Sequence, residues 1–387
     1  MMKKLGLIAL VMGLVTALAM PVLAFSIDGA KGQKMYIGGL IQTDFGYWNR
    51  SKERTGAGED NTQFITSVIN SSRVRGSFEV GDVGGYWELG NGGEVQGATG
   101  EGVGTTNYIE TRKLYGWYKF GNCEIRAGKD DGYLYTLVAS PLMGLNNGFH
   151  VVGFGFGSVY DSRNPQVRFT QNVSKQFGYA VTLLQPDVKV DSTRTSYATL
   201  PTVAVKLNLN FGAISLYPAG LYQQIKWDKM PSGFDDTMTA WYGVLPVKVA
   251  VGGFTGIVQG GYGQNIAGPL ALESAFQSYR RDAEGKVKNT TGVNAFVDLA
   301  YTFGPATPHL YFGYDNAKNS DVYGKLANSD DNNTRLMYGI SIRYNVAPGF
   351  ILSPEFTMYD YGKDPTKANK PDLGKEWLGG LTFLFVF

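Results

Sequence analysis

The chain has 387 residues with 35 basic and 33 acidic side chains, so its formal net charge is only +2. This near balance excludes the strongly basic surface that a nucleic-acid-binding protein requires. The single cysteine, Cys123, excludes an internal disulfide, a Cys-x-x-Cys-His haem attachment and a cysteine-rich zinc site. Aromatic residues make up 13% of the chain and 52 residues are glycine, which is typical of strands and turns.

The first 24 residues have the three parts of a secretory signal peptide. Lys3 and Lys4 supply the cations, residues 5–20 form an apolar core, and residues 22–24 are a small-residue cleavage site. The alternative is a single transmembrane helix, because the apolar core is nearly long enough to span a bilayer. We expect residues 1–24 to be removed as a signal peptide, which leaves residues 25–387 as one domain with no formal net charge.

From Lys34 onward the chain consists of segments of about ten residues in which apolar and polar positions alternate. In residues 335–344, for example, one parity is wholly apolar: Leu336, Tyr338, Ile340, Ile342 and Tyr344. Side chains alternate across a strand, so these five share one face. A soluble β-sandwich would alternate as well, but aromatic residues at the strand ends favour a strand that crosses lipid.

The connections between these segments are alternately short and long. Short turns fall near residues 81–84, 121–122, 172–176, 211–212, 252–253, 304–305 and 347–349. Long polar loops fall near residues 49–66, 96–107, 131–164, 186–197, 228–236, 265–290, 317–333 and 361–374. The pattern predicts an all-β fold, a transmembrane antiparallel β-barrel of about sixteen strands. Fourteen and eighteen strands are the alternatives, because three glycine-rich segments are poorly patterned.

The last eleven residues form the clearest strand. Trp377, Gly379, Leu381, Phe383, Phe385 and Phe387 share one apolar face with an aromatic at each end. At roughly 3.3 Å per residue and a tilt of about 45°, ten residues span roughly the apolar band of an outer-membrane barrel. This segment is predicted to be the closing strand.

Two parts of the chain resemble a known family. The stretch from Arg112 to Lys129 resembles the fourth and fifth strands of general bacterial porins, with an Arg-started strand, a Gly-bearing turn and a strand ending in Gly and a basic residue. Residues 130–164 follow where that family places a loop that folds into the pore, and residues 167–170 look like its sixth strand. Phe387 is similar to the C-terminal assembly signal of outer-membrane proteins. The resemblance implies a water-filled channel, commonly trimeric, with an eyelet between the inserted loop and a basic wall.

The parity of the strands predicts which arginines face the lumen. The predicted basic ladder consists of Arg73, Arg75, Arg112, Arg126 and Arg168. Arginine stays charged and holds a planar set of donors, and rings of such charges select among permeating ions. The alternative is that these arginines only form lumenal salt bridges with Glu79, Glu110 and Glu124.

The expected constriction loop departs from the family pattern because residues 132–160 contain no acid. Its candidate residues are Asp130, Asp131, Tyr133, Tyr135, Phe149, Phe154, Phe156 and Asp161. A loop that folds inward would place an aromatic and apolar surface opposite the basic wall, and the pore would then favour anions or amphiphilic solutes. The alternative is that the loop packs against the inner wall or against the next protomer.

We therefore predict an outer-membrane porin of a Gram-negative bacterium, exported with a cleaved signal peptide, through which small hydrophilic solutes and ions diffuse with a weak anion preference. A substrate-selective channel for anionic or amphiphilic solutes, and a closed barrel acting as adhesin or anchor, are the alternatives. Expected partners are outer-membrane lipid and lipopolysaccharide, further copies of the chain in a homotrimer, and the barrel assembly machinery through the C-terminal strand. No cofactor or metal is expected. An enzyme is not expected either, since there are only two histidines, His150 and His309, and no Gly-x-Ser-x-Gly motif.

Overall fold

The computed structural model describes residues 25–29, 32–68, 72–91, 109–132, 155–159, 163–186, 196–267, 277–323 and 332–387. The strands of its main sheet are β1 (Phe25–Asp28), β2 (Gln33–Arg50), β3 (Asn61–Val68), β4 (Arg73–Val80), β5 (Val83–Asn91), β6 (Ile109–Phe120), β7 (Cys123–Asp131), β8 (Arg163–Asn172), β9 (Phe177–Leu184), β10 (Ser196–Tyr197), β11 (Thr202–Phe211), β12 (Ile214–Leu216), β13 (Ala219–Trp227), β14 (Thr237–Val251), β15 (Phe254–Gln264), β18 (Thr291–Tyr301), β19 (Ala306–Lys318), β20 (Asn332–Ala347), β21 (Phe350–Asp360) and β22 (Lys375–Val386). A helix, α2 (Lys52–Thr55), and a hairpin of β16 (Arg280–Arg281) and β17 (Val287–Lys288) lie in loops. The predicted signal peptide, residues 1–24, is outside the described residues.

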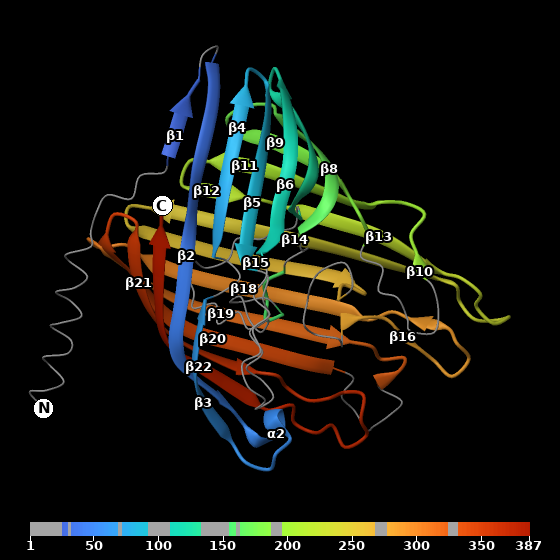
Figure 1. Ribbon diagram of the computed structural model, residues 1–387. Coiled ribbons are helices and arrows are strands. Elements are labelled where there is room, and N and C mark those ends of the chain that lie inside the picture. The colour runs from blue at the N-terminus through green and yellow to red at the C-terminus, as the bar shows by residue number, and fades with distance from the viewer. Residues whose placement is uncertain are drawn as a thin grey trace, which may run out of the picture.

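The sheet is antiparallel throughout and closes on itself. The first long strand, β2, pairs with the last, β22, from Leu40 opposite Val386 to Arg50 opposite Glu376. In Figure 1 the strands from β2 to β8 cross in front of the strands from β14 to β22, as the near and far walls of a barrel with tilted strands do.

The barrel has sixteen strand positions, which confirms the predicted fold. The sheet contains twenty hydrogen-bonded segments. Of these, β3 and β4 occupy one position beside β2, and β12 and β13 occupy one position beside β14. The segments β1 and β10 only add pairs at the ends of β2 and β13. The loop expected at residues 49–66 is shorter than predicted, because β2 continues to Arg50 and β3 begins at Asn61.

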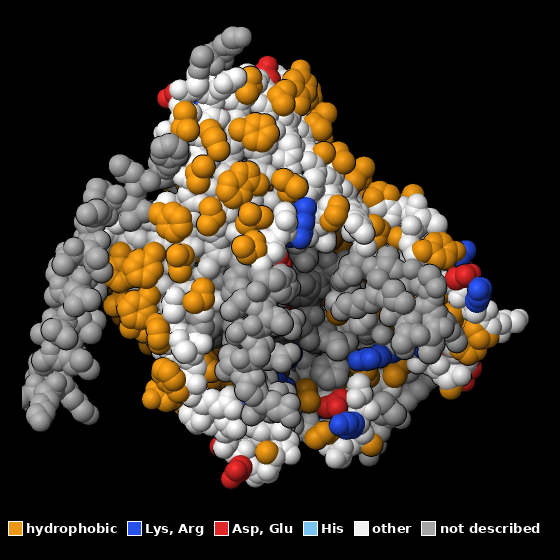
Figure 2. Space-filling view, viewed as in Figure 1, with side chains coloured by type: hydrophobic (Ala, Val, Ile, Leu, Met, Phe, Trp, Pro, Cys, Tyr) orange, Lys and Arg blue, Asp and Glu red, His pale blue; other side chains and the backbone are white. Residues whose placement is uncertain are grey.

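Burial alternates along the strands as the period of two requires. On β20 the residues Arg335, Met337, Gly339 and Ser341 are buried, whereas Tyr338, Ile340, Ile342 and Tyr344 are exposed. On β22 the exposed face is the predicted apolar one. Figure 2 shows hydrophobic side chains spread over the outer surface of the wall and charged ones gathered where the loops lie. Such a surface suits hydrocarbon. Within the described ranges, no helix is both long and apolar enough to span a bilayer.

The C-terminal residue takes part in the closure of the barrel. Phe387 donates its backbone N–H to the carbonyl of Gly39 at 3.0 Å, and Gly39 donates to the carbonyl of Phe387 at 2.6 Å. The Phe387 ring lies so near that a Cβ at Gly39 would meet it at 3.0 Å. The final aromatic therefore fills the space that the missing side chain of Gly39 leaves.

A charge placed on the outer face of β20 tests whether this face meets lipid. Ile340 lies in the middle of the strand and Tyr344 near its end, and both are exposed. We expect Ile340→Arg to lower the free energy of unfolding in phospholipid vesicles by about 2–4 kcal/mol, and Tyr344→Arg by about 0–1 kcal/mol. Denaturant titration followed by tryptophan fluorescence measures both losses. Equal losses at the two depths would contradict the assignment.

Candidate functional site: the lumenal wall and the inserted segment

The five predicted ladder arginines lie on the inner face of four strands of one wall, β4, β6, β7 and β8. Arg73 and Arg75 are on β4, Arg112 is on β6, Arg126 is on β7 and Arg168 is on β8. Arg126 and Arg168 are directly opposite each other in the register of β7 and β8. Arg112 and Arg168 are buried, and the other three are half-buried. The structure thus brings the five residues together on one wall.

The carboxylate of Glu88, on β5, holds two arginines of this wall. Its Oε1 accepts from Nε of Arg112 at 2.9 Å, and its Oε2 lies 3.2 Å from Nε of Arg73. The hydroxyl of Tyr86 also donates to Oε2 at 2.9 Å. One buried carboxylate therefore fixes two guanidinium groups. Glu88 was not among the acids that the sequence suggested as partners.

The carboxylate of Asp130, at the beginning of the long loop, is shared by three cations. Its Oδ2 lies 2.8 Å from Nη1 of Arg126 and 3.3 Å from Nη1 of Arg168, and its Oδ1 lies 3.4 Å from Nζ of Lys113. Lys113 also pairs with Asp131. Because one negative charge serves several positive ones here, the wall keeps an excess of positive charge.

Lys113 reaches the lumen because of a β-bulge. The register between β5 and β6 shifts between Glu88, which is opposite Lys113, and Leu89, which is opposite Thr111, so Arg112 is the extra residue of the bulge. The shift reverses the parity of β6 and places the adjacent Arg112 and Lys113 on the same inner face. Strict alternation placed Lys113 outside, and the only signal in the sequence was the adjacent pair of basic residues.

The alternative pairing predicted for the arginines is present in part. Glu110 lies 3.8 Å from Arg112, and Glu124 lies 2.9 Å from Arg126. Glu79 pairs instead with Lys119, at 2.8 Å. Within the described ranges no carboxylate forms an ion pair with Arg75. The arginines are therefore partly neutralised.

The two ends of the long loop are joined at the wall. The side-chain amide of Gln166 donates to the carbonyls of Asp130 and Asp131, at 2.8 and 2.9 Å. Arg168 donates from Nη2 to the carbonyl of Asp131 at 2.7 Å. These bonds fix where the chain leaves β7 and where it returns to β8.

The described part of this loop, residues 155–159, lies inside the barrel against the far wall. Gly157 is so close to the strands that a Cβ there would overlap the carbonyl of Ala295 on β18, and one at Gly313 on β19 would overlap the carbonyl of Phe156. Asp315 accepts a hydrogen bond from the backbone of Gly157, and Gln259 donates to its carbonyl at 3.4 Å. Residues 155–159 therefore lie against strands on the opposite side of the lumen from β7 and β8.

The described segment, residues 155–159, packs on the inner wall of the barrel. Phe156 and Val159 are fully buried. The ring of Phe156 packs against Tyr359 and Tyr361, with centroid distances of 5.1 and 5.3 Å. The remaining candidate residues of the loop, Tyr133, Tyr135, Phe149, Phe154 and Asp161, lie outside the described residues.

The other lumenal acids have partners of their own. Asp44 accepts from Thr382 at 2.6 Å, Glu355 accepts from Thr357 at 2.7 Å, and Asp298 lies 3.1 Å from Nδ1 of His309.

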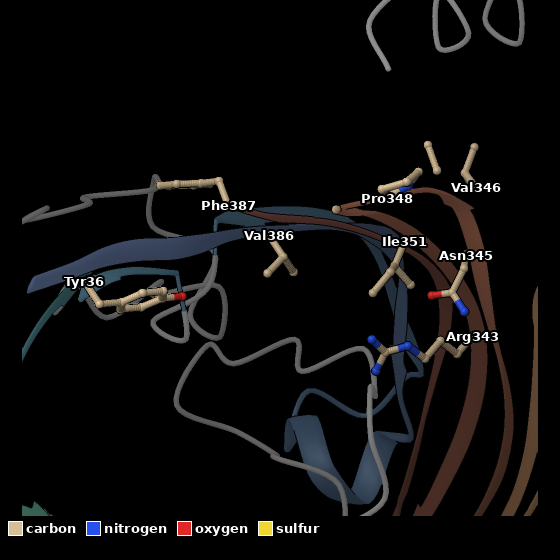
Figure 3. Close-up of a pocket in the computed structure, with 10 residues that line it drawn as sticks. Tyr36, Arg343, Asn345, Val346, Pro348, Ile351, Val386 and Phe387 are labelled. Carbon is tan, nitrogen blue, oxygen red and sulfur yellow. The ribbon is translucent and has the colours of Figure 1, made fainter. Parts of the chain in front are cut away.

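Two lumenal cations, Lys248 and Arg343, form no hydrogen bond or ion pair with the described part of the chain. Arg343 extends into a cavity of about 630 Å³ at the end of the barrel where the C-terminus lies, as Figure 3 shows.

The comparisons with known proteins identify this fold. No family model matches the chain, and no curated protein matches it. Among solved structures it is similar to the outer membrane channel DcaP of Acinetobacter baumannii, with a TM-score of 0.71 and 16% identity, over 94% of this chain and 100% of that one. It is also similar to the anion-selective porin from Comamonas acidovorans, with a TM-score of 0.58 and 12% identity, over 92% and 100%.

The chain has the sixteen-stranded porin fold. A third similar structure, Salmonella typhi OmpF in complex with daunomycin, has a TM-score of 0.57 and 11% identity, over 93% of this chain and 100% of that one. The porin fold accounts for the closure of β2 on β22 and for a long connection between β7 and β8. At these identities the similarity is one of fold, and the lumenal residues described above are specific to this chain.

A methyl group added at Gly313 tests the placement of residues 155–159, which we call the inserted segment. We expect Gly313→Ala to displace residues 155–159, because the new Cβ would overlap the carbonyl oxygen of Phe156. The probe is a cysteine at position 158, a fully buried site, in a chain whose Cys123 is serine. Weakening the anchor by about 1.4 kcal/mol would raise the maleimide labelling rate about tenfold.

The matched control is Gly243→Ala, because a Cβ at Gly243 would meet nothing within 4 Å. Heat-modifiable migration on a gel checks that both variants form the barrel. Labelling that is equally slow in the Gly313 and Gly243 variants would show that the segment does not rest on β19.

Proposed function

We propose that this protein is an outer-membrane porin that forms a water-filled channel for passive diffusion of small hydrophilic solutes and ions, with a weak preference for anions. A barrel of sixteen strands encloses a lumen too wide for side chains alone to fill. The observation that carries the proposal is the position of residues 155–159, which belong to the β7–β8 connection and lie against β18 and β19 across the lumen. In this proposal the segment narrows the lumen and leaves it open to small solutes.

The anion preference follows from how the charges of the β4–β8 wall are paired. Glu88 and Asp130 are each shared by two or three cations, and the acids of the other wall are bonded to Thr382, Thr357 and His309. An anion that passes the wall therefore meets incompletely neutralised guanidinium groups. Because these groups already hold protein carboxylates, they attract a permeating anion weakly and release it easily.

Location and assembly are part of the same proposal. We infer that residues 1–24 direct export and are removed, and that residues 25–387 insert into the outer membrane as one domain. The barrel assembly machinery would recognise the C-terminal strand, and lipid and lipopolysaccharide would surround the apolar outer face. A homotrimer is supported by the trimer form of the similar Vibrio cholerae OmpT, which has a TM-score of 0.57 and 13% identity.

A hydrolytic function is not favoured, although three suitable side chains are neighbours. Asp298 contacts His309, and Ser341 lies opposite His309 in the register of β19 and β20. All three side chains are buried, and no hydrogen bond joins Ser341 to His309. The backbone N–H groups of these strands are engaged in the sheet, so no oxyanion donor is available beside Ser341. His150 lies outside the described residues.

The reversal potential of single channels in a KCl gradient tests the function and its selectivity. Removing one lumenal charge about 8 Å from a permeating ion changes its energy by about 0.5 kcal/mol in water, or about twofold in permeability ratio. We expect the pair Arg112→Ser and Arg126→Ser to lower the chloride-to-potassium permeability ratio. Asp130→Asn removes one charge instead of two and should raise it about twofold, because three cations lose their shared carboxylate.

The matched control is Lys175→Ser, which removes a cation from an exposed turn outside the lumen. Absence of conductance steps from pure folded protein would refute the channel. Strong cation selectivity, or arginine variants and Asp130→Asn that shift the ratio in the same direction, would refute the role assigned to the basic wall.

A further inference from the structure

The ring of Phe156, in the inserted segment, is held by a buried arginine of the far wall. The guanidinium carbon of Arg335, on β20, lies 4.1 Å from the centroid of the Phe156 ring. Arg335 is opposite Asp315 in the register of β19 and β20, and Asp315 accepts the hydrogen bond from Gly157. The opposite charges of one cross-strand pair therefore hold two consecutive residues of the inserted segment, one through its ring and one through its backbone.

Arg335 also contacts an aromatic ring at the beginning of the last loop. The same guanidinium group lies 4.9 Å from the ring centroid of Tyr361, which begins the last loop. The guanidinium carbon of Arg54 lies 3.7 Å from the ring centroid of Tyr361. Arg54 belongs to the helix α2, in the loop between β2 and β3. Arg54 thus contacts Tyr361, and the groups of Tyr361, Arg335 and Phe156 contact one another, since the two rings lie 5.3 Å apart. We call these four residues the stack.

The outer end of the stack is fixed to the barrel. Glu376 on β22 accepts from Nε of Arg54 and from the hydroxyl of Tyr361, both at 2.9 Å. The backbone N–H of Ser51 donates to the carbonyl of Lys375 at 2.9 Å, and the hydroxyl of Ser51 accepts from the N–H of Lys375 at 3.0 Å. Figure 1 shows α2 beside the end of β22. The first and last outer loops are therefore joined where the stack begins.

We propose that Arg335 and Tyr361 are positioning residues of the pore, and that Arg54, in an outer loop, controls through them where the inserted segment lies. The guanidinium group of Arg335 contacts both rings, and each ring contacts the other, so the three groups are held only while all of them stay in place. Loss of Arg54 would loosen Tyr361, and with it Arg335 and Phe156. A side chain of an outer loop would thus influence the narrow part of the lumen without lining it. This inference rests on the proposed channel function for its electrical test, but not for its structural one.

The electrical test compares two cations of the same helix in planar bilayers. Arg54→Ala and Lys52→Ala each remove one positive charge from α2, but only Arg54 contacts a ring of the stack. In 1 M KCl the screening length is about 3 Å, so a charge at the pore mouth has little effect of its own. We expect Arg54→Ala to raise the frequency of transitions between conductance levels at least about threefold, and Lys52→Ala to leave it unchanged. Arg335→Lys and Tyr361→Leu should raise it further.

The structural test needs no channel. It measures maleimide labelling of a cysteine at position 158, in the Cys123→Ser chain, for folded barrels that carry each substitution. We expect Arg335→Lys, which keeps the charge but not the planar group, to raise the labelling rate about threefold to tenfold, and Lys52→Ala to leave it unchanged. Labelling that Arg335→Lys and Arg54→Ala both leave unchanged would overturn the proposal. A wild-type protein without conductance, combined with faster labelling, would refute the channel and keep the stack.

Discussion

The pairing of β2 with β22 is the constraint on which the rest of the structure depends. A strand in hydrocarbon has no water to bond its free N–H and C=O groups, so a sheet that spans lipid must have no open edge. Leu40 opposite Val386 and Arg50 opposite Glu376 mark the length over which the last strand meets the first. The bonds between Phe387 and Gly39 continue this closure to the final residue. Once the sheet is closed, one face of every strand must be apolar and the other encloses a lumen.

The closed barrel concentrates charge on its inner face. Arginines on β4, β6, β7 and β8 stand side by side because antiparallel neighbours in a barrel bring inward positions into rows. Buried guanidinium groups need partners, and Glu88 and Asp130 provide them while leaving the wall positive.

The connection between β7 and β8 is attached to the two walls in different ways. Its two ends are fixed at the basic wall by Gln166 and Arg168, through bonds to the backbone around Asp131. Its described segment, residues 155–159, rests on the opposite wall, where Gly157 and Gly313 leave room for two backbones to touch. The stack from Arg54 to Phe156 adds a third attachment, which begins outside the lumen. Because the three attachments lie on different strands, the position of residues 155–159 depends on several parts of the barrel.

The sequence alone predicted the barrel, a count of about sixteen strands, the closing strand and the inward arginines, because all of these follow from a period of two and from where the turns fall. The choice of sixteen over fourteen or eighteen came from the strand pairing. The sequence could not determine which acid meets which arginine. The bulge at Arg112 adds Lys113 to the lumen, and the adjacent basic pair does not by itself predict a register shift. It also left open where the acid-free loop would lie. Only the tertiary structure places Phe156 against Arg335 and Tyr361, since these residues are about two hundred positions apart and meet only after the sheet has closed. Periodicity encodes the face that a side chain occupies, whereas its partner depends on strand register and on chain segments that cross the lumen.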